Sequence, residues 1–246
     1  MTLLSILLVG FLLGMKHATE TDHLAAMATL AVGKQTLRQT LWQGVAWGTG
    51  HTATLMLFGG IVLLLGKAVP PSLELSLELA VGVMLVALGA DVFRRLRKEK
   101  IHFHAHSHQA GARHVHAHSH LNEVAVQKRH AQSEHQHPHA RWLPWRALLV
   151  GMMHGMAGTA ALILLSLEAV QNVSTGLVYI LCFGVGSIIG MALLSTVISI
   201  PLRLSVGRLT WLHQGVTLVF GGASCLIGLA MVYRIGFVER LLLFNT

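Results

Sequence analysis

Long runs of apolar residues alternate with short polar connections along most of the chain. Six runs contain about the 20 mainly apolar residues that a helix needs to cross the hydrocarbon core of a bilayer. They cover residues 3–32, 41–66, 74–96, 145–169, 173–200 and 213–235. The pattern predicts an all-α integral membrane protein with six transmembrane helices. The short connections leave room for a single transmembrane domain over residues 1–246.

Composition favours a membrane protein over a soluble one. Hydrophobic residues make up 53% of the chain and charged residues 11%, whereas soluble domains carry about 25% charged residues. A soluble all-helical core is the alternative, but its helices would need polar faces, which the six runs lack. The first run is too long for a removable signal peptide and carries charges in its second half, so we expect it to remain as a helix.

Basic residues are distributed unevenly between the connections. Fourteen lie after the first, third and fifth runs, ten of them between Arg94 and Arg146, and only three lie in the connections on the opposite side. The positive-inside rule therefore predicts a multi-pass protein of the cell membrane, with the central connection in the cytoplasm and both termini outside. The net charge of +8 reflects this topology. The expected partner is the lipid bilayer, and no feature points to nucleic acid.

The two halves of the chain share motifs in the same order. Gly14–His17 matches Gly151–His154, and a Gly-x-Gly step follows each of them by about 30 residues. The third and sixth runs each contain two glycines seven residues apart. These matches predict that residues 145–240 repeat residues 3–96. Because each copy has three helices, the second copy is inverted in the membrane, an arrangement typical of transporters whose substrate binds near the midplane between the repeats.

A polar cluster interrupts the first apolar run. Ionisable side chains crowd into residues 16–23, and each costs a few kcal/mol at membrane depth. A loop between two short helices, with its charges in water, is one explanation. On a straight helix, at about 100° per residue, Asp22 would point about 140° away from His17, and His23 about 120° away on the other side. We therefore predict that this helix is interrupted near the midplane, where the three side chains converge.

The residue types in this cluster are those of a transition-metal site. Imidazole binds nickel, cobalt, zinc and copper, and a neighbouring carboxylate offsets the charge of the ion. Calcium and magnesium would need more oxygen ligands. We predict that His17, Asp22 and His23 bind the metal as a transported substrate, Ni²⁺ or Co²⁺, and that no separate cofactor is required. These ligand types do not rank nickel or cobalt against zinc or manganese.

Three motifs resemble those of the nickel/cobalt transporter family. The spacing of His17, Asp22 and His23 has its His-x4-Asp-His form, and Gly50-His51-Thr52 is similar to its next motif. Residues 151–158 fit the Gly-x-x-His-Gly-x-Ala-Gly pattern of the shorter six-helix members of the urease-accessory type. The resemblance implies a permease. Longer members have an acidic stretch where this chain has Met153–Gly158, which leaves the metal preference open.

Other polar residues near the cluster are candidates for the same site. His51, His154 and Glu20 are predicted to be further ligands, while Thr49, Thr52 and Thr19 are candidates for hydrogen bonds to the metal-bound imidazoles. For His51 the alternative is a buried histidine bonded to a backbone carbonyl. For His154 the alternative to a ligand is a role as a gate or in helix packing.

Histidines are concentrated in the central polar segment, residues 97–143. The motif of residues 102–108 recurs at 114–120, and the segment has low complexity and no hydrophobic period, which predicts disorder. We expect it to be a cytoplasmic metal buffer or acceptor, too loose to set selectivity, although a passive tether is the alternative. The predicted ligands in the two copies of the motif are His102, His104, His106, His108, His114, His116, His118 and His120.

Taken together, these features predict a secondary transporter for divalent transition metals, with uptake favoured over efflux by a protein of the same fold. An intramembrane metalloenzyme is disfavoured because the predicted helices lack the repeated histidine boxes of membrane oxygenases. A homo-oligomer or a cytoplasmic metallochaperone partner stays open.

Overall fold

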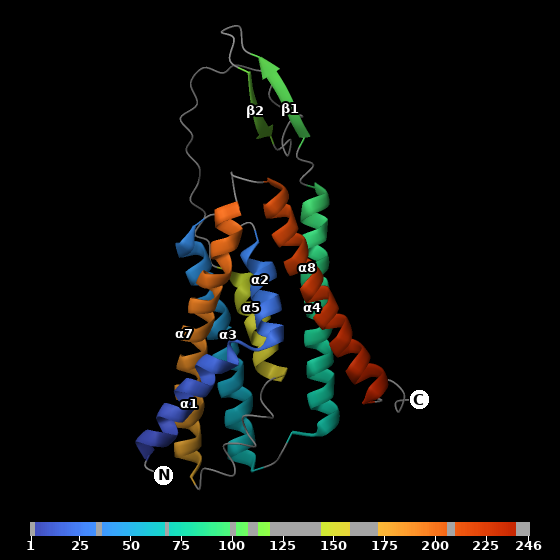
Figure 1. Cartoon of the computed structure of the whole chain (residues 1–246). Helices are drawn as coiled ribbons and strands as arrows, with labels where there is room; N and C mark the ends of the chain where they lie inside the picture. Colours follow the sequence, from blue (N-terminus) through green and yellow to red (C-terminus); the bar gives the residue numbers. More distant parts are fainter. Residues whose placement is uncertain are drawn as a thin grey trace. The chain divides into compact units, whose positions relative to one another are not determined.

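The computed structural model describes residues 3–32, 36–66, 69–98, 102–107, 113–118, 144–157, 172–205 and 210–239. The chain divides into two compact units, one formed by Met1–Val92 with Pro144–Thr246 and the other by Phe93–Leu143. The helices are α1 (Leu3–His17), α2 (Thr21–Ala31), α3 (Leu37–Leu65), α4 (Pro71–Lys98), α5 (Trp145–Ala157), α7 (Val173–Ser205) and α8 (Thr210–Tyr233), followed by the π-helical turn η1 (Arg234–Val238) (Figure 1).

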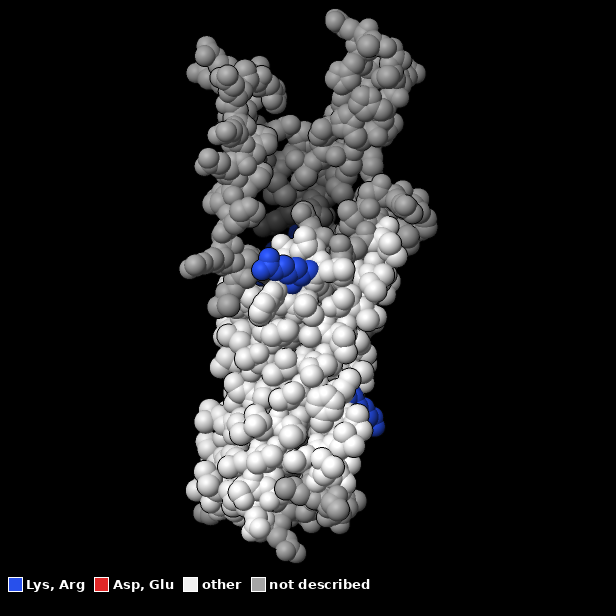
Figure 2. Space-filling view, turned by 90° about the vertical axis from the view of Figure 1, so that its left-hand side faces the viewer, with Lys and Arg blue, Asp and Glu red and all other residues white. Residues whose placement is uncertain are grey.

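Within the described residues, four helical stretches are long and apolar enough to cross a membrane: Leu37–Leu65, Pro71–Arg97, Val173–Leu202 and His213–Val238. Their outer surfaces expose many large apolar side chains, a distribution that suits contact with lipid. Figure 2 shows one such face, where the described part is uncharged apart from small basic areas. The chain is a multi-pass membrane protein.

The other two predicted spans have a different form. The predicted run of residues 3–32 consists of α1 and α2, separated by a break after His17. The predicted run of residues 145–169 begins with α5, and its part beyond Ala157 lies outside the described residues.

Glycines allow the helices of the two halves to approach at backbone distance. A Cβ atom on Gly14 of α1 would collide with the backbone of Phe183 in α7, and one on Gly151 of α5 would collide with the backbone of Trp47 in α3. α4 and α8 meet in the same way, because a Cβ on Gly89 would collide with Gly221. Small residues at helix crossings are typical of packing within membranes, where close van der Waals contact replaces the hydrophobic effect.

The central unit contains a two-stranded antiparallel sheet of β1 (His102–Ser107) and β2 (Arg113–His118). Its register pairs His102 with His118 and His106 with His114. The all-helical class is confirmed for the described part of the unit formed by Met1–Val92 with Pro144–Thr246, while the predicted disorder of residues 97–143 as a whole stays a prediction. Histidine at every second position matches the two-residue period of a strand, so two copies of one motif can pair along their length. His108 and His120 lie outside the described residues.

Candidate metal centre

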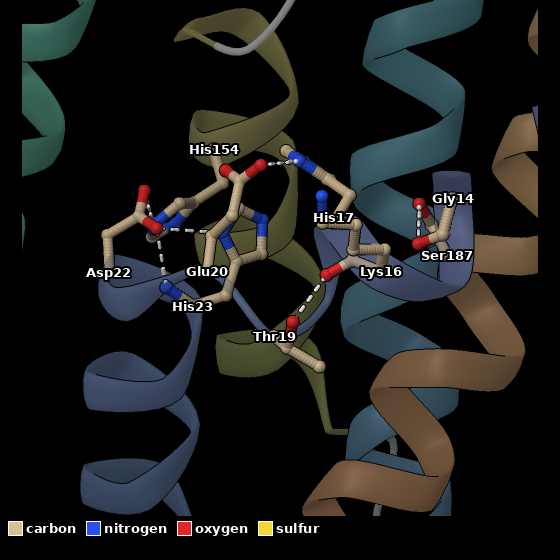
Figure 3. Close-up of polar contacts among 9 residues, drawn as sticks. All are labelled: Gly14, Lys16, His17, Thr19, Glu20, Asp22, His23, His154 and Ser187. Atoms are coloured by element: carbon tan, nitrogen blue, oxygen red, sulfur yellow. Dashed lines mark hydrogen bonds and ion pairs between the residues drawn. The ribbon is translucent and has the colours of Figure 1, made fainter. Parts of the chain in front are cut away.

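The break between α1 and α2 places His17 at the end of a helix. Two backbone bonds close the turn, from Thr19 N–H to the Lys16 carbonyl at 2.9 Å and from Glu20 N–H to the His17 carbonyl at 3.0 Å. The Nδ1 atom of His17 lies 2.8 Å from Glu20 Oε1 (Figure 3). A carboxylate only accepts hydrogen bonds, so Nδ1–H donates and the lone pair of His17 is on Nε2. This Nε2 atom is buried and has no hydrogen-bond partner.

Asp22 orients His23 in the first turn of α2. The backbone N–H of His23 donates to Asp22 Oδ1 at 2.8 Å, and its Nδ1–H donates to the same oxygen at 3.0 Å. The Nε2 lone pair of His23 is therefore also buried without a partner. This imidazole-to-carboxylate bond is the contact that metal-binding histidines usually make through the nitrogen that does not bind the ion.

α3 contributes His51, whose ring centre lies 5.0 Å from that of His17 and 5.4 Å from that of His23. The side chain is 0% exposed, and neither ring nitrogen has a hydrogen-bond partner in the described structure. Buried polar groups without partners are rare in folded proteins and call for an explanation, such as an ion. The expected alternative for His51, a bond to a backbone carbonyl, is not what the structure shows.

α5 contributes His154, in the last turn of that helix. Its Nε2 atom lies 3.5 Å from Asp22 Oδ2, at the long limit of a hydrogen bond, and its ring centre lies 4.7 Å from that of His23. Close approach of α5 to α3 makes this position possible, because a Cβ on Gly155 would collide with the backbone of His51.

The possible ligands form two overlapping groups. Within each group, the candidate ligand atoms all lie within 4.8 Å of one another. One group is His17, His23 and His51, and the other is Asp22, His23 and His154. Ligand atoms about 2.1 Å from one tetrahedral ion are about 3.4 Å apart, so each pair would have to close by at most about 1.4 Å to complete either set. His23 belongs to both groups, while Asp22 lies on the side of His154.

The helix termini favour a cation at this place. His17 lies in the last turn of α1 and His154 in the last turn of α5. The carbonyl ends of helices carry partial negative charge, which stabilises a nearby cation by about 0.3–1 kcal/mol at exposed sites and by more in buried geometry. The carbonyl end of α1, which the described turn after His17 closes, therefore adds to the field of the Asp22 and Glu20 carboxylates.

A cavity of about 630 Å³ adjoins the histidines. Its lining includes His17, Glu20, Asp22, His23 and His154 from the cluster, two further carboxylates, Glu74 and Glu78 of α4, and apolar residues such as Val81 and Met231. Glu20 is 57% exposed in its side chain, whereas His23 and His154 are buried. The cavity thus connects an acidic, exposed region with the buried imidazoles.

The three predicted hydrogen-bonding threonines have other partners. Thr19 Oγ1 donates to the Lys16 carbonyl at 2.6 Å and closes the end of α1. Thr49 Oγ1 donates to the Val45 carbonyl at 2.8 Å on an exposed part of α3, and Thr52 Oγ1 donates to the Gly184 carbonyl at 3.1 Å. Each hydroxyl thus donates to a backbone carbonyl in this structure, and a role of these threonines in orienting metal-bound imidazoles stays a prediction.

Two features of the site were missed in the sequence. Trp47 is fully buried, and its ring centre lies 5.3 Å from that of His154 and 6.1 Å from that of His23. It precedes His51 by four residues, a spacing that places both on one face of α3 and could have identified it. Glu74 and Glu78 are the second feature, and their spacing of four on α4 was a similar signal.

One comparison with known proteins covers nearly the whole chain. The chain is 35% identical over 240 residues to the urease accessory protein UreH of Bacillus sp. (strain TB-90), and the alignment covers 97% of this chain and 95% of that protein. No family model matches the chain. No solved structure matches it.

Proposed function

Because this chain belongs to the family of the urease accessory protein UreH, the short type of nickel/cobalt transporter that its motifs resemble, we propose that it is a permease for divalent transition-metal ions. Nickel and cobalt are the proposed substrates, and uptake is the proposed direction. The name of the relative links it to urease, and the imidazole-rich site supports a metal of this class as the cargo.

The observation that carries this proposal is the set of buried imidazole nitrogens without partners. His17 and His23 each donate one N–H to a carboxylate, which leaves the Nε2 lone pair to bind a cation. His51 offers a third nitrogen. In this proposal these three side chains bind the dehydrated ion, while Glu20 and Asp22 orient the rings and offset its charge.

The second group, with Asp22 and His154, is proposed as the next position of the ion. An ion that moves there keeps His23 as a neighbour and exchanges His17 and His51 for Asp22 and His154. Sharing one ligand lowers the barrier for transfer because the ion is never without protein ligands. Rocking of one inverted repeat against the other would drive this exchange. The contacts of Gly14 with α7 and of Gly151 with α3 support the repeat, since these two glycines hold matching positions in the two halves.

Uptake is favoured by electrostatics. An inside-negative potential of 100 mV supplies about 4.6 kcal/mol for a divalent cation, twice the value for one charge. Efflux by the same fold is the alternative. Loss of an importer leaves cells short of metal, whereas loss of an exporter makes them sensitive to added metal, so the phenotype of a deletion strain separates the two.

The test is uptake of radiolabelled nickel and cobalt into proteoliposomes with an imposed membrane potential. Wild type should show saturable uptake that competing divalent ions reduce, and His17→Ala should abolish it. Thr49→Val is the matched control because Thr49 is exposed on α3 and its hydroxyl donates to the Val45 carbonyl of its own helix. Absence of uptake by well-folded wild type would refute the permease, and full activity of His17→Ala would refute the site.

A further inference from the structure

One face of α4 extends the metal centre toward the end of the bundle. Glu74, Glu78 and Val81 line the cavity, and their spacing of four and three residues aligns them along the helix. Glu74 lies in the first turn of α4. The positive-inside pattern predicts that this end of α4 faces the outside of the cell. The cavity therefore has two carboxylates, one helical turn apart on α4, on the side from which an imported ion would arrive.

The two carboxylates have different partners. Glu78 Oε2 accepts a hydrogen bond from Arg234 Nη2 at 3.0 Å, and Arg234 Nε donates to Glu239 Oε1 at 3.1 Å. Within the described residues no cationic side chain pairs with Glu74, and its carboxylate interacts with the like-charged Glu78. Arg234 begins the π-helical turn η1, and such turns are frequent at functional sites.

Two carboxylates on a helix are not a binding site by themselves, but here they share a cavity with buried ligands. His23 lines the same cavity, is almost fully buried, and has an Nε2 atom without a hydrogen-bond partner. Four carboxylates and only one lysine line the cavity. A cleft lined by one sign of charge raises the local concentration of the opposite ion and its rate of association.

We propose that Glu74 and Glu78 form an outer binding station, where a hydrated divalent cation is captured before it loses water to the imidazoles. This inference rests on the proposed transport function. Carboxylates bind such an ion through oxygen atoms and water, so the station takes divalent cations broadly and selection follows at the histidines. Arg234 is the competitor of the ion for Glu78: it neutralises that carboxylate in the absence of metal and is displaced as the cation binds.

A structural role for the same residues predicts a different result. If the Glu78–Arg234 pair only ties the start of α4 to the end of α8, removal of either partner would impair the protein in the same direction. If the carboxylate captures the ion, Glu78→Gln slows capture and Arg234→Gln accelerates it. Opposite effects of the Glu78 and Arg234 substitutions on the rate of nickel uptake would therefore distinguish ion capture from a purely structural role.

The experiment is initial nickel uptake by proteoliposomes over a range of metal concentrations, at low and at physiological ionic strength. Glu74→Gln and Glu78→Gln should each lower the initial slope of uptake rate against nickel concentration by about threefold, and the double variant should lower it by about tenfold. The maximal uptake rate should change little. Arg234→Gln should raise the slope. Added salt should reduce these differences, since charges are screened over about 8 Å at 0.15 M.

Two controls complete the design. Asp91→Asn removes the same charge from α4 at a position that does not line the cavity, and it should leave the slope unchanged. Glu78→Asp keeps the negative charge and should retain most of the wild-type slope of nickel uptake. If wild type transports nickel while the glutamine variants match Asp91→Asn, or if Arg234→Gln lowers the slope as Glu78→Gln does, the outer station is refuted and the permease stands. If wild type transports no metal, the permease itself fails.

Discussion

Replacing His51 by leucine is expected to stabilise the metal-free protein while abolishing metal uptake. The imidazole is fully buried, and neither nitrogen has a hydrogen-bond partner in the described part of the chain. A buried polar group without a partner costs about 1–3 kcal/mol. Leucine has no polar atom and a comparable size, so the free energy of unfolding should rise by a similar amount, less the cost of imperfect packing.

Thermal unfolding of the purified protein in detergent, with and without nickel, measures this change. For a chain of this length, 1 kcal/mol shifts the Tm by about 2–4 °C, so the metal-free variant should unfold about 2–10 °C above wild type. Nickel at 1,000 times its Kd stabilises wild type by about 4.1 kcal/mol, and the variant should lose most of that shift. Addition of nickel should therefore reverse the order of the two proteins.

A contrasting substitution one turn away is the control. Thr54 is buried like His51, but its hydroxyl donates to the carbonyls of Gly50 and His51 at 3.0 Å. Thr54→Val removes satisfied hydrogen bonds and should destabilise the protein by about 0.5–1.5 kcal/mol. If metal-free His51→Leu also unfolds several degrees below wild type, the imidazole stabilises the core and the reasoning from its unpartnered nitrogens is wrong.

Three further predictions concern other parts of the molecule. Asp22→Asn should raise the KM for nickel uptake about 10–100-fold, the usual effect of altering a residue that orients a metal-binding histidine, and an unchanged KM would exclude that role. Deletion of residues 102–139 should lower the metal retained by cells but preserve saturable uptake in proteoliposomes; loss of uptake by a well-folded deletion protein would contradict the buffer role. Gly151→Ala should lower the Tm because the added Cβ meets the backbone of Trp47. Gly222→Ala should raise the Tm slightly, because its Cβ meets nothing within 4 Å and alanine favours the helix. Equal Tm shifts of the two variants would argue against the contact between α5 and α3.

The interruption of the first helix could be predicted because its polar residues contradict an uninterrupted helix in lipid. His17 and His23 could not both face one ion on a straight helix, and the break after His17 brings their ring centres to 4.5 Å from one another. The partners of the site were harder to predict. A helix that is apolar all round has no polar face to fix its rotation, so the sequence alone does not specify that Thr49 faces away from the cluster while His51 faces into it. The contacts of Gly151 and Gly155 with α3 determine that rotation.

The neighbours of the Asp22 carboxylate could not be predicted from the sequence either. The motif predicts His17, Asp22 and His23 as one set, yet the structure divides them between two groups that share His23. Asp22 reaches His154, which is distant in sequence and approaches through α5. Only the packing of α5 against α3 decides which neighbour the carboxylate meets, and no spacing within α1 and α2 contains that information.

A carrier must be stable both without its ion and with it, and the carboxylate–imidazole pairs meet both requirements. Without metal, Glu20 and Asp22 accept N–H bonds from His17 and His23, which partly compensates the charge of both carboxylates, above all that of the less exposed Asp22. In the proposed transport cycle the same bonds would stay in place with metal bound, because the ion would take the opposite ring nitrogens, and its two positive charges would offset the two carboxylates. A monovalent cation would offset only one of the two carboxylate charges, and the remaining charge would be most costly on Asp22, the less exposed of the two. We therefore expect the two pairs to favour a divalent over a monovalent cation, with the choice among divalent metals left to the imidazoles.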